Sequence, residues 1–356
     1  MKIMFYITTI ERGGGAERVI CNLANQFSTA GNQCIVVTSN DAEQKYDLGE
    51  EVKYIPLTDT RIPGFIKRNW KVFRLLRKAV IEHKPDVLIS FMAEPNFRAI
   101  PACAGTKTKT IISVRNDPNR EYPTPIHKFL AKTLFKRADF TVFQTKDAQA
   151  WVPKSVIRKS SVIKNQVDYR FFNENQTENP RNIISVGRLE PQKNHKLLID
   201  AFARISEKCP DNLIIIGEGS LRKDLENQIN NSGLSERVLL PGTTDNVINR
   251  LISAKIFALS SDYEGMPNTL MEAMALGLPC ISTDCPCGGP KELIQNESNG
   301  ILTQVGNADS MATALIKLIS DDSLRKKCGE NARKTAMEFY PDNIFDLWNK
   351  TVKSII

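Results

Sequence analysis

Two glutamates with seven residues between them, Glu264 and Glu272, are the most informative feature of this 356-residue chain. Gly265 and Pro267 follow the first of them, and proline is well tolerated in the first turn of a helix, so the pattern predicts a helix that begins near Met266. The first turn of a helix leaves backbone N–H groups unpaired, and such groups bind anions. Glu272 lies about one turn further along, where it can accept hydrogen bonds from hydroxyl groups attached to the same anion.

These residue types describe a pocket for a nucleotide sugar. A diphosphate would lie at the N–H groups of Asn268, Thr269 and Leu270, a diol beside one carboxylate and a sugar beside the other. Taken alone, the two glutamates are equally consistent with solvated or ion-paired surface positions. Apolar runs at 254–259 and 279–282 flank the motif, however, and this order of strand, loop, helix and strand is an α/β unit, which binds ligands at the carboxyl ends of its strands.

The wider pattern resembles the glycosyltransferase family 4 enzymes of the GT-B fold, which are retaining transferases that use nucleoside-diphosphate sugars. The matching segments occur in the expected order along nearly the whole chain: Gly13-Gly14-Gly15 with Ala16-Glu17-Arg18, Gly187-Arg188-Leu189 with Lys193-Asn194, the Glu264 and Glu272 pair, Asn299-Gly300, and Asp309. The resemblance implies an α/β protein of the GT-B fold, with two Rossmann-like domains that face a central cleft.

Apolar runs that alternate with helical patterns predict two series of strands. The first series is 3–7, 33–38, 52–55, 87–91, 110–114 and 140–144, and the second is 183–186, 212–216, 238–240, 255–259 and 280–282. We expect an acceptor-binding domain in residues 1–172 and a donor-binding domain in 183–338, with a linker in the polar residues 173–182. The resemblance implies that a C-terminal helix in 339–356 crosses back to the first domain.

The resemblance also assigns roles to single residues. Arg188 and Lys193 would bind the diphosphate and stabilise its growing negative charge in the transition state, so neither a divalent metal nor another cofactor is expected. Glu264 would contact the donor sugar, and Glu272 the ribose hydroxyls. The further donor-binding positions are Gly14, Gly15, Gly187, Thr243, Met266, Pro267, Asn268 and Thr269.

Each of these roles has a plainer alternative. Exposed Arg and Lys are common on any surface, and the segment Pro241-Gly242-Thr243-Thr244 would look the same if it were a simple strand-to-helix turn. The Gly13–Gly15 loop could be a tight turn without a ligand or part of a dinucleotide site, although its spacing is not Gly-x-Gly-x-x-Gly.

Arg115 marks a departure from the family pattern. Many members carry a His at the end of a strand near the transferred sugar, whereas this chain has Arg115 there. The three histidines lie elsewhere: His83, His127 and His195. Arg115 is therefore a candidate catalytic residue that could hold a sugar hydroxyl or an acceptor phosphate, and a salt bridge with Asp117 or Asp139 is the structural alternative.

The charge of the chain points to acidic partners. Lys and Arg number 48 and Asp and Glu 40, which gives a net charge of +8 and an isoelectric point near 9.0. Basic and aromatic residues alternate in two segments, 61–78 and 126–137, which could lie on an anionic membrane surface or pack their apolar stripes on a sheet. Together with the resemblance, this predicts a glycan or lipid-diphosphate-linked acceptor in polysaccharide or O-antigen assembly.

Other classes of protein are less well supported. No run of about 18 apolar residues is present, and residues 1–7 form an expected first strand rather than a signal peptide, so the chain is expected to be cytoplasmic. The eight cysteines lack the spacing of a zinc site and are expected to be reduced. A GT-B epimerase would need acid and base residues that this chain does not obviously supply. A nucleic-acid-binding protein is suggested only by charge.

UDP is the expected nucleotide by family habit, GDP stays open, and the sugar is not specified. Retention by front-face attack follows from the resemblance.

Overall fold

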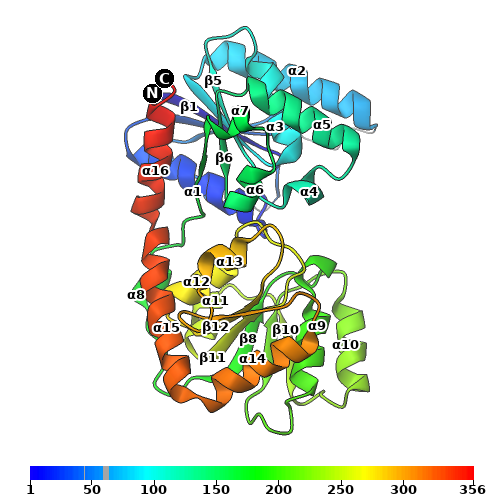
Figure 1. The fold of residues 1–356 in the computed structure, drawn as a ribbon. Helices are drawn as coiled ribbons and strands as arrows, with labels where there is room; N and C mark the ends of the chain where they lie inside the picture. Colours follow the sequence, from blue (N-terminus) through cyan, green and yellow to red (C-terminus); the bar gives the residue numbers. More distant parts are fainter. Residues whose placement is uncertain (44, 59–63) are drawn as a thin grey trace. The chain divides into compact units, whose positions relative to one another are not determined.

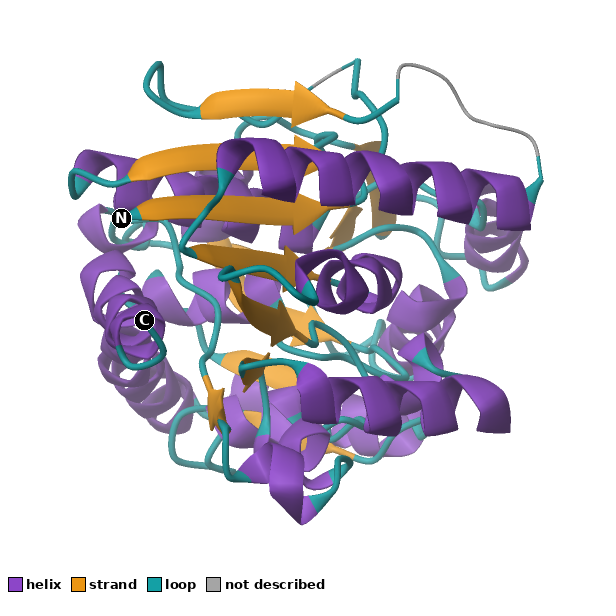
Figure 2. Ribbon diagram, turned by 90° about the horizontal axis from the view of Figure 1, so that it is seen from above, coloured by secondary structure: helices purple, strands orange, loops and turns teal. Residues whose placement is uncertain are grey.

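The computed structural model describes residues 1–43, 45–58 and 64–356, and its contacts divide the chain into two compact units. The first unit contains Met1–Gln166 and Asp342–Ile356, and the second contains Val167–Pro341. Each unit is built on its own parallel sheet with helices on both faces (Figures 1 and 2).

The sheet of the first unit has the strand order β3-β2-β1-β4-β5-β6-β7, and every neighbouring pair is parallel. The strands are β1 Lys2–Ile7, β2 Gln33–Thr38, β3 Lys53–Pro56, β4 Val87–Phe91, β5 Lys109–Ser113, β6 Phe140–Phe143 and β7 Ser160–Val162. The strands β2 and β3 are added on one side of β1, and the strands β4 to β7 are added on its other side. This order places a topological switch point between β1 and β4.

Alternate residues of β1 serve opposite faces of this sheet, as the two-residue period of a strand requires. Ile3 and Phe5 pack with α1 (Gly15–Thr29) and α16 (Pro341–Lys353), whereas Met4 and Tyr6 pack with α2 (Phe65–His83) and α3 (Ala93–Cys103). The unit is completed by α4 Pro118–Glu121, α5 Pro125–Leu134, η1 Phe135–Arg137, α6 Lys146–Ala150 and α7 Lys154–Ile157.

The sheet of the second unit repeats the same topology, with the order β10-β9-β8-β11-β12-β13 and parallel neighbours throughout. The strands are β8 Arg181–Val186, β9 Leu213–Ile216, β10 Val238–Gly242, β11 Ala254–Leu259, β12 Cys280–Thr283 and β13 Ile301–Thr303. The helices are α8 Arg170–Asn173, η2 Pro191–Lys193, α9 His195–Ala203, α10 Arg222–Asn231, α11 Val247–Ile252, α12 Asn268–Ala275, α13 Gly289–Leu293, α14 Ala308–Ser320, α15 Asp322–Ala336 and η3 Met337–Phe339. The switch point of this sheet lies between β8 and β11.

The predicted α/β class with two Rossmann-like sheets is confirmed, and each of the eleven predicted strands is present with ends within two residues of the prediction. The strands β7 and β13 were not predicted. Both have three residues and pair with only one neighbour at the edge of a sheet, so neither has the long apolar run of a central strand.

The boundary between the units differs from the predicted linker at 173–182. Phe171 and Phe172 are buried in the core of the second unit, and Arg333 of α15 donates hydrogen bonds to the carbonyl oxygens of Phe172 (2.7 Å) and Glu174 (3.0 Å). Residues 167–182 therefore belong to the second unit. Phe339 is also buried in that core, and the segment that packs on the first sheet begins at Asp342.

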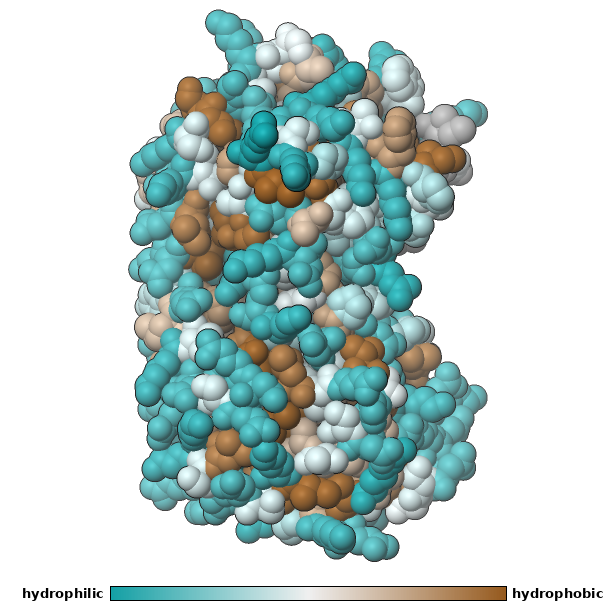
Figure 3. Space-filling view, viewed as in Figure 1, coloured by the Kyte–Doolittle hydropathy of each residue, from teal (hydrophilic) through white to brown (hydrophobic). Residues whose placement is uncertain are grey.

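One face of the molecule shows how hydrophilic and hydrophobic side chains are distributed on the surface. Hydrophilic side chains cover most of the face in Figure 3, and hydrophobic ones appear in small patches. Within the described ranges, no helix combines the length and the apolar character that crossing a membrane would require.

Candidate functional site

The predicted donor residues of the second unit lie at its switch point. Gly187 and Arg188 follow β8, and the segment from Ser260 to Glu264 follows β11, which is the neighbouring strand. In parallel sheets of this order the connections leave the two central strands in opposite directions, which opens a crevice at their carboxyl ends. The sequence thus brings its charged residues to the place where such a sheet binds ligands.

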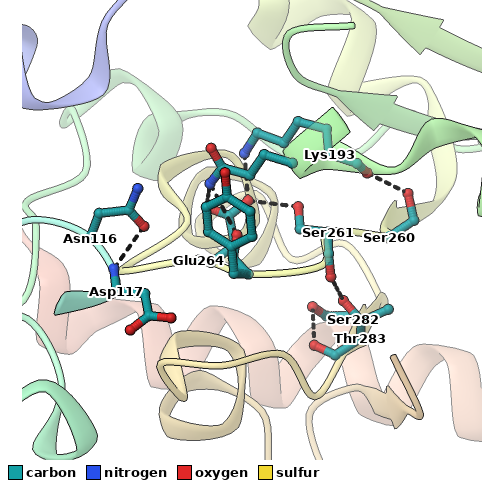
Figure 4. A network of polar contacts seen from close by, with 10 residues as sticks. Asn116, Asp117, Lys193, Ser260, Ser261, Glu264, Ser282 and Thr283 are labelled. Carbon is teal, nitrogen blue, oxygen red and sulfur yellow. Dashed lines mark hydrogen bonds and ion pairs between the residues drawn. The ribbon is translucent and has the colours of Figure 1, made fainter. Parts of the chain in front are cut away.

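Glu264 and Lys193 form the centre of this site. The Nζ atom of Lys193 lies 2.5 Å from Oε1 of Glu264, and only 15% of the lysine side chain and 7% of the glutamate side chain are exposed. The Oγ atom of Ser261 donates a 2.6 Å hydrogen bond to the same carboxylate oxygen (Figure 4). The carboxylate is therefore held by a cation and a hydroxyl in a largely dry setting, where electrostatic interactions are stronger than in water.

Hydrogen bonds to the loop after β11 fix the position of the segment 192–194, which contains Lys193. Asn194 caps α9 with a left-handed backbone (φ 43°), and its side chain donates a 2.7 Å hydrogen bond to Oδ1 of Asp262. The Asp262 N–H donates to the carbonyl of Gln192 (2.9 Å), and the Ser260 hydroxyl donates to the carbonyl of Lys193 (2.9 Å). These three hydrogen bonds, together with one of 3.0 Å from the Gln192 side chain to the carbonyl of Tyr263, tie the lysine segment to the loop after β11.

The roles of Gln192, Asn194, Ser260 and Ser261 were not predicted. Asn194 had a detectable signal, because Asn before an apolar helical pattern is a common helix cap. The serines carry no such signal, since their function depends on the pairing of β8 with β11.

Close backbone contacts shape the loop that carries Glu264. A Cβ atom placed on Gly289, at the start of α13, would lie 1.9 Å from the carbonyl oxygen of Gly265. The Glu264 N–H also donates to the carbonyl of Pro286 (2.8 Å), and the Cys287 N–H donates to the carbonyl of Glu264 (3.2 Å). Only glycine at 289 permits this approach, so the orientation of Glu264 depends on a residue 25 positions further along the chain.

The helix that carries Glu272 begins two residues later than predicted. α12 starts at Asn268, and Pro267 is its N-cap with an extended backbone (φ −75°, ψ 103°), so Met266 and Pro267 belong to the preceding loop. Glu272 is 3% exposed, and it follows Asn268 by one turn of the helix. The Oγ1 atom of Thr269 is buried and has no hydrogen-bond partner among the described residues. The first turn of α12 therefore presents N–H groups and an unsatisfied hydroxyl on the side of the helix that also carries Glu272.

Two other predicted residues lie at the same edge of the sheet and outside the Glu264 network. Arg188 is exposed after β8, and Thr243 is exposed after β10. Their side chains are accessible to a ligand. Their roles stay predictions.

His195 is buried beside this segment at the start of α9 and is 2% exposed. Burial lowers the pKa of its imidazole to about 4, and the nearby charge of Lys193 acts in the same direction. The ring is therefore neutral at physiological pH.

The predicted glycine residues of the first unit lie after β1, at the switch point of its sheet. Gly14 is the N-cap of α1, and the Tyr46 hydroxyl accepts a hydrogen bond from the Gly13 N–H and donates one to the Gly14 carbonyl, both 3.1 Å long. A Cβ atom on Gly14 would lie 1.9 Å from Oε2 of Glu17. The Glu17 carboxylate therefore occupies the start of α1 beside Gly14 and Gly15, and an anion that binds there would have to displace it.

Arg115 lies in the interior of the first unit and is 7% exposed. Its guanidinium stacks over the Phe91 ring at 4.3 Å and donates hydrogen bonds to Oδ1 of Asn165 and, at 3.4 Å, to Oγ of Ser113. Burial lowers the pKa of Arg115 to about 9, and the Glu121 carboxylate opposes that shift. Burial also raises the pKa of Glu121 to about 8.

The two salt bridges considered for Arg115 are absent. Asp117 caps α4 by accepting from the Asn119 N–H (2.9 Å), and Asp139 pairs with Lys109 (3.2 Å). Both carboxylates have local partners, and the Arg115 guanidinium instead donates to Asn165 and Ser113 and stacks on Phe91, while its buried Nε atom has no hydrogen-bond partner among the described residues. Its catalytic role stays a prediction.

The described ranges contain no evident metal-binding site. No three His, Cys, Asp or Glu side chains there lie close enough together to hold a metal ion.

Comparison with known proteins connects this arrangement to a family. Residues 168–335 match the family described as Glycosyl transferases group 1, and residues 13–171 match Glycosyltransferase Family 4. An uncharacterized glycosyltransferase of Methanocaldococcus jannaschii is 31% identical over 346 residues, a match that covers 82% of this chain and 84% of that protein. The chain belongs to the group 1 glycosyltransferases. It is therefore a transferase that acts on sugars, as the glutamate pair and the order of the motifs indicated.

More distant comparisons agree with this assignment. A Campylobacter jejuni enzyme is 29% identical over all of this chain and 99% of its own length, and its name describes an α-1,4-N-acetyl-D-galactosaminyltransferase that acts on a diphospho-undecaprenol-linked glycan. The crystal structure of Anabaena HepE in complex with UDP matches this glycosyltransferase with a TM-score of 0.82 at 19% identity, and it covers 99% of this chain and 100% of that one. That structural likeness supports the GT-B fold.

Proposed function

We propose that this glycosyltransferase moves a sugar from a nucleoside-diphosphate sugar, with UDP as the nucleotide, to a lipid-diphosphate-linked glycan in cell-surface polysaccharide assembly. The acceptor class rests on similarity to the C. jejuni enzyme, whose name specifies a glycan on diphospho-undecaprenol. UDP is supported by the complex of the structural relative HepE. The observation that carries the proposal is the buried Lys193 and Glu264 pair at the switch point of the second sheet, next to the first turn of α12.

The donor would bind across these elements. The first-turn N–H groups of α12, with Lys193 and the exposed Arg188, supply positive charge for a diphosphate, and buried Glu272 can accept hydrogen bonds from ribose hydroxyls. Glu264 is oriented by Ser261 and Lys193 and would contact the sugar. The donor-binding roles of Gly14, Gly15, Gly187, Thr243, Met266, Pro267, Asn268 and Thr269 are part of the same proposal.

Transfer would proceed with retention of configuration and without a metal ion. The bond between the anomeric carbon and the phosphate oxygen breaks while the acceptor oxygen forms its bond to the same face of that carbon, and the departing phosphate takes the acceptor proton. The diphosphate gains negative charge in this step. Two fixed cations near it would therefore stabilise the transition state more than the bound donor.

The experiment offers radiolabelled UDP-hexoses and UDP-N-acetylhexosamines to the purified enzyme with a short-chain lipid-diphosphate disaccharide as acceptor. The proposal predicts a lipid-linked product with the anomeric configuration of the donor, as read by NMR. An inverted product would refute retention, and release of free or epimerised sugar without transfer would refute the proposed acceptor.

A further inference from the structure

Two segments of the first unit concentrate the positive charge of the chain. Residues 64–84 contain seven Lys or Arg and one Glu, and residues 125–137 contain four Lys or Arg and no acidic residue. Their combined net charge of +10 exceeds the +8 of the whole chain, so the other residues together are slightly negative. The basic character is thus a property of α2 and of α5 with η1, and any acidic partner would be drawn to these helices.

The cations of α2 form one exposed stripe. Exposed residues recur at intervals of three or four, which places them on the same side of a helix. These residues are Lys67, Trp70, Lys71, Arg74, Lys78, Ile81 and Glu82, so the stripe carries four cations and one carboxylate. Trp70 is 62% exposed and Ile81 52% exposed. Arg77 lies off this stripe and caps the end of α3 by donating to the carbonyls of Ala102 (3.1 Å) and Ala104 (2.9 Å).

α5 exposes apolar side chains instead of burying them. Ile126 is 71% exposed, Phe129 69% and Leu130 42%, and their spacing places all three on one side of the helix. Among the described residues of α5, only Ala131 is buried. Single exposed hydrophobic residues are ordinary, but a cluster of three large ones on one helix marks an interaction surface.

The two helices share one layer of the first unit. α3 packs against both α2 and α5, and Figure 2 shows all three helices on the same side of the sheet. Lys128 and Lys132 accompany the apolar triad within α5, and Lys136 and Arg137 follow it in η1. The layer therefore combines a basic stripe with an apolar cluster that is itself flanked by cations.

We propose that α2 and α5 dock the first unit onto an anionic lipid bilayer. The triad Ile126, Phe129 and Leu130 enters the boundary between headgroups and acyl chains, and the cations of α2 contact lipid phosphates. A bilayer supplies both the negative charge and the apolar phase that this surface requires. A second copy of the chain would bring the same positive charge against it. The inference rests on the proposed lipid-linked acceptor for its purpose, but the binding itself is independent of catalysis.

The test measures co-sedimentation of the full chain with vesicles of phosphatidylglycerol mixed with phosphatidylcholine, and with vesicles of phosphatidylcholine alone, at low and high salt. The expected result is binding to the anionic vesicles that weakens with salt. Lys71→Glu/Arg74→Glu should weaken partitioning at least roughly thirtyfold, because each cation lost near such a surface removes about 1 kcal/mol and each new carboxylate is repelled by the lipid phosphates. Ile126→Ser/Phe129→Ser should weaken it at least about tenfold through lost apolar burial.

Matched variants of the second unit serve as controls. Lys326→Glu/Lys334→Glu on α15 makes the same charge change at exposed positions, and Leu239→Ser/Ile316→Ser removes two side chains that are 41% and 43% exposed. Both should bind vesicles like the wild-type protein. All four variants should keep the stabilisation by nucleoside diphosphate, which shows that the second unit is intact.

Three outcomes would overturn the docking proposal: no binding to anionic vesicles at low salt, equal binding by the α2 and α5 variants, or a dimer in solution that these variants disperse. Vesicle binding by a protein that transfers no sugar would support docking and refute only the proposed function. If the α2 and α5 variants transfer sugar to a lipid-linked acceptor in vesicles at the wild-type rate, that result would also contradict docking.

Discussion

Replacing Lys193 by alanine should separate catalysis from folding, because the second unit contains a matched ion pair elsewhere. Lys255 and Asp211 lie 2.9 Å apart with side chains that are 18% and 7% exposed, compared with 2.5 Å, 15% and 7% for Lys193 and Glu264. Lys255 is at the start of β11, whereas Glu264 follows its end. The two pairs therefore differ in their place in the fold and hardly in their burial.

The structural cost of the two substitutions should be similar. Each leaves a largely buried carboxylate without its cation, which typically costs about 3–5 kcal/mol, and the Ser261 hydroxyl continues to satisfy part of Glu264. Thermal unfolding should show both variants, Lys193→Ala and Lys255→Ala, with a Tm lower by several degrees.

Activity should distinguish the two variants. Loss of a fixed donor to the developing charge costs about 10²–10³ in kcat, so Lys193→Ala should lose that much in kcat/KM for sugar transfer, while Lys255→Ala should stay close to the wild-type value. Steady-state kinetics with saturating acceptor give this comparison. If Lys193→Ala is destabilised like Lys255→Ala but transfers sugar at the wild-type rate, Lys193 is a structural residue and the electrostatic argument is refuted.

Three further predictions concern the same unit. Gly289→Ala should destabilise the fold by about 1–3 kcal/mol or more, because its Cβ would lie 1.9 Å from the Gly265 carbonyl oxygen; Gly49→Ala, whose nearest neighbour would be 3.7 Å away, is the control in thermal unfolding, and equal stability of the two variants would contradict the geometry. His195 has a pKa of about 4 in the folded state and near 6.5 when unfolded, so the unfolded state binds more protons between these values and stability should fall by up to about 3 kcal/mol as pH drops from 6.5 to 4. Denaturant titrations across this range should show a smaller drop for His195→Leu, and an identical slope would exclude His195 as the cause. Sugar transfer should be unchanged by a chelating agent; loss of activity that Mg²⁺ or Mn²⁺ restores would overturn the proposed metal independence.

Sequence reasoning was most successful where the signal was local. The central strands are continuous apolar runs with turn residues at their ends, and their positions were predicted to within two residues. Glu264, Glu272 and Lys193 were singled out because their segments follow expected strand ends and resemble the motifs of glycosyltransferase family 4, and their roles in donor binding stay predictions. The edge strands β7 and β13 were missed because three residues do not establish a period.

The partners of the site residues could not be predicted in the same way. Lys193 meets Glu264 across 71 positions of sequence because β8 and β11 are neighbours, and Arg115 meets Asn165 across 50 positions. Such contacts depend on strand order and on side-chain rotamers together. The predicted linker was wrongly placed for a related reason: the polar residues that suggested it are held by Arg333, which lies more than 150 positions further along the chain.

The claim that a nucleoside diphosphate binds at the switch point of the second unit is central to this account. A thermal-shift titration with UDP, GDP, ADP and NAD, on the wild-type chain and on Glu272→Ala, tests it most directly. A ligand at about 100 times its dissociation constant adds about 2.7 kcal/mol to the stability of the state that binds it. The account predicts metal-independent stabilisation by one nucleoside diphosphate that is much weaker in Glu272→Ala. Stabilisation by NAD alone, or equal stabilisation of both proteins by the diphosphate, would contradict it.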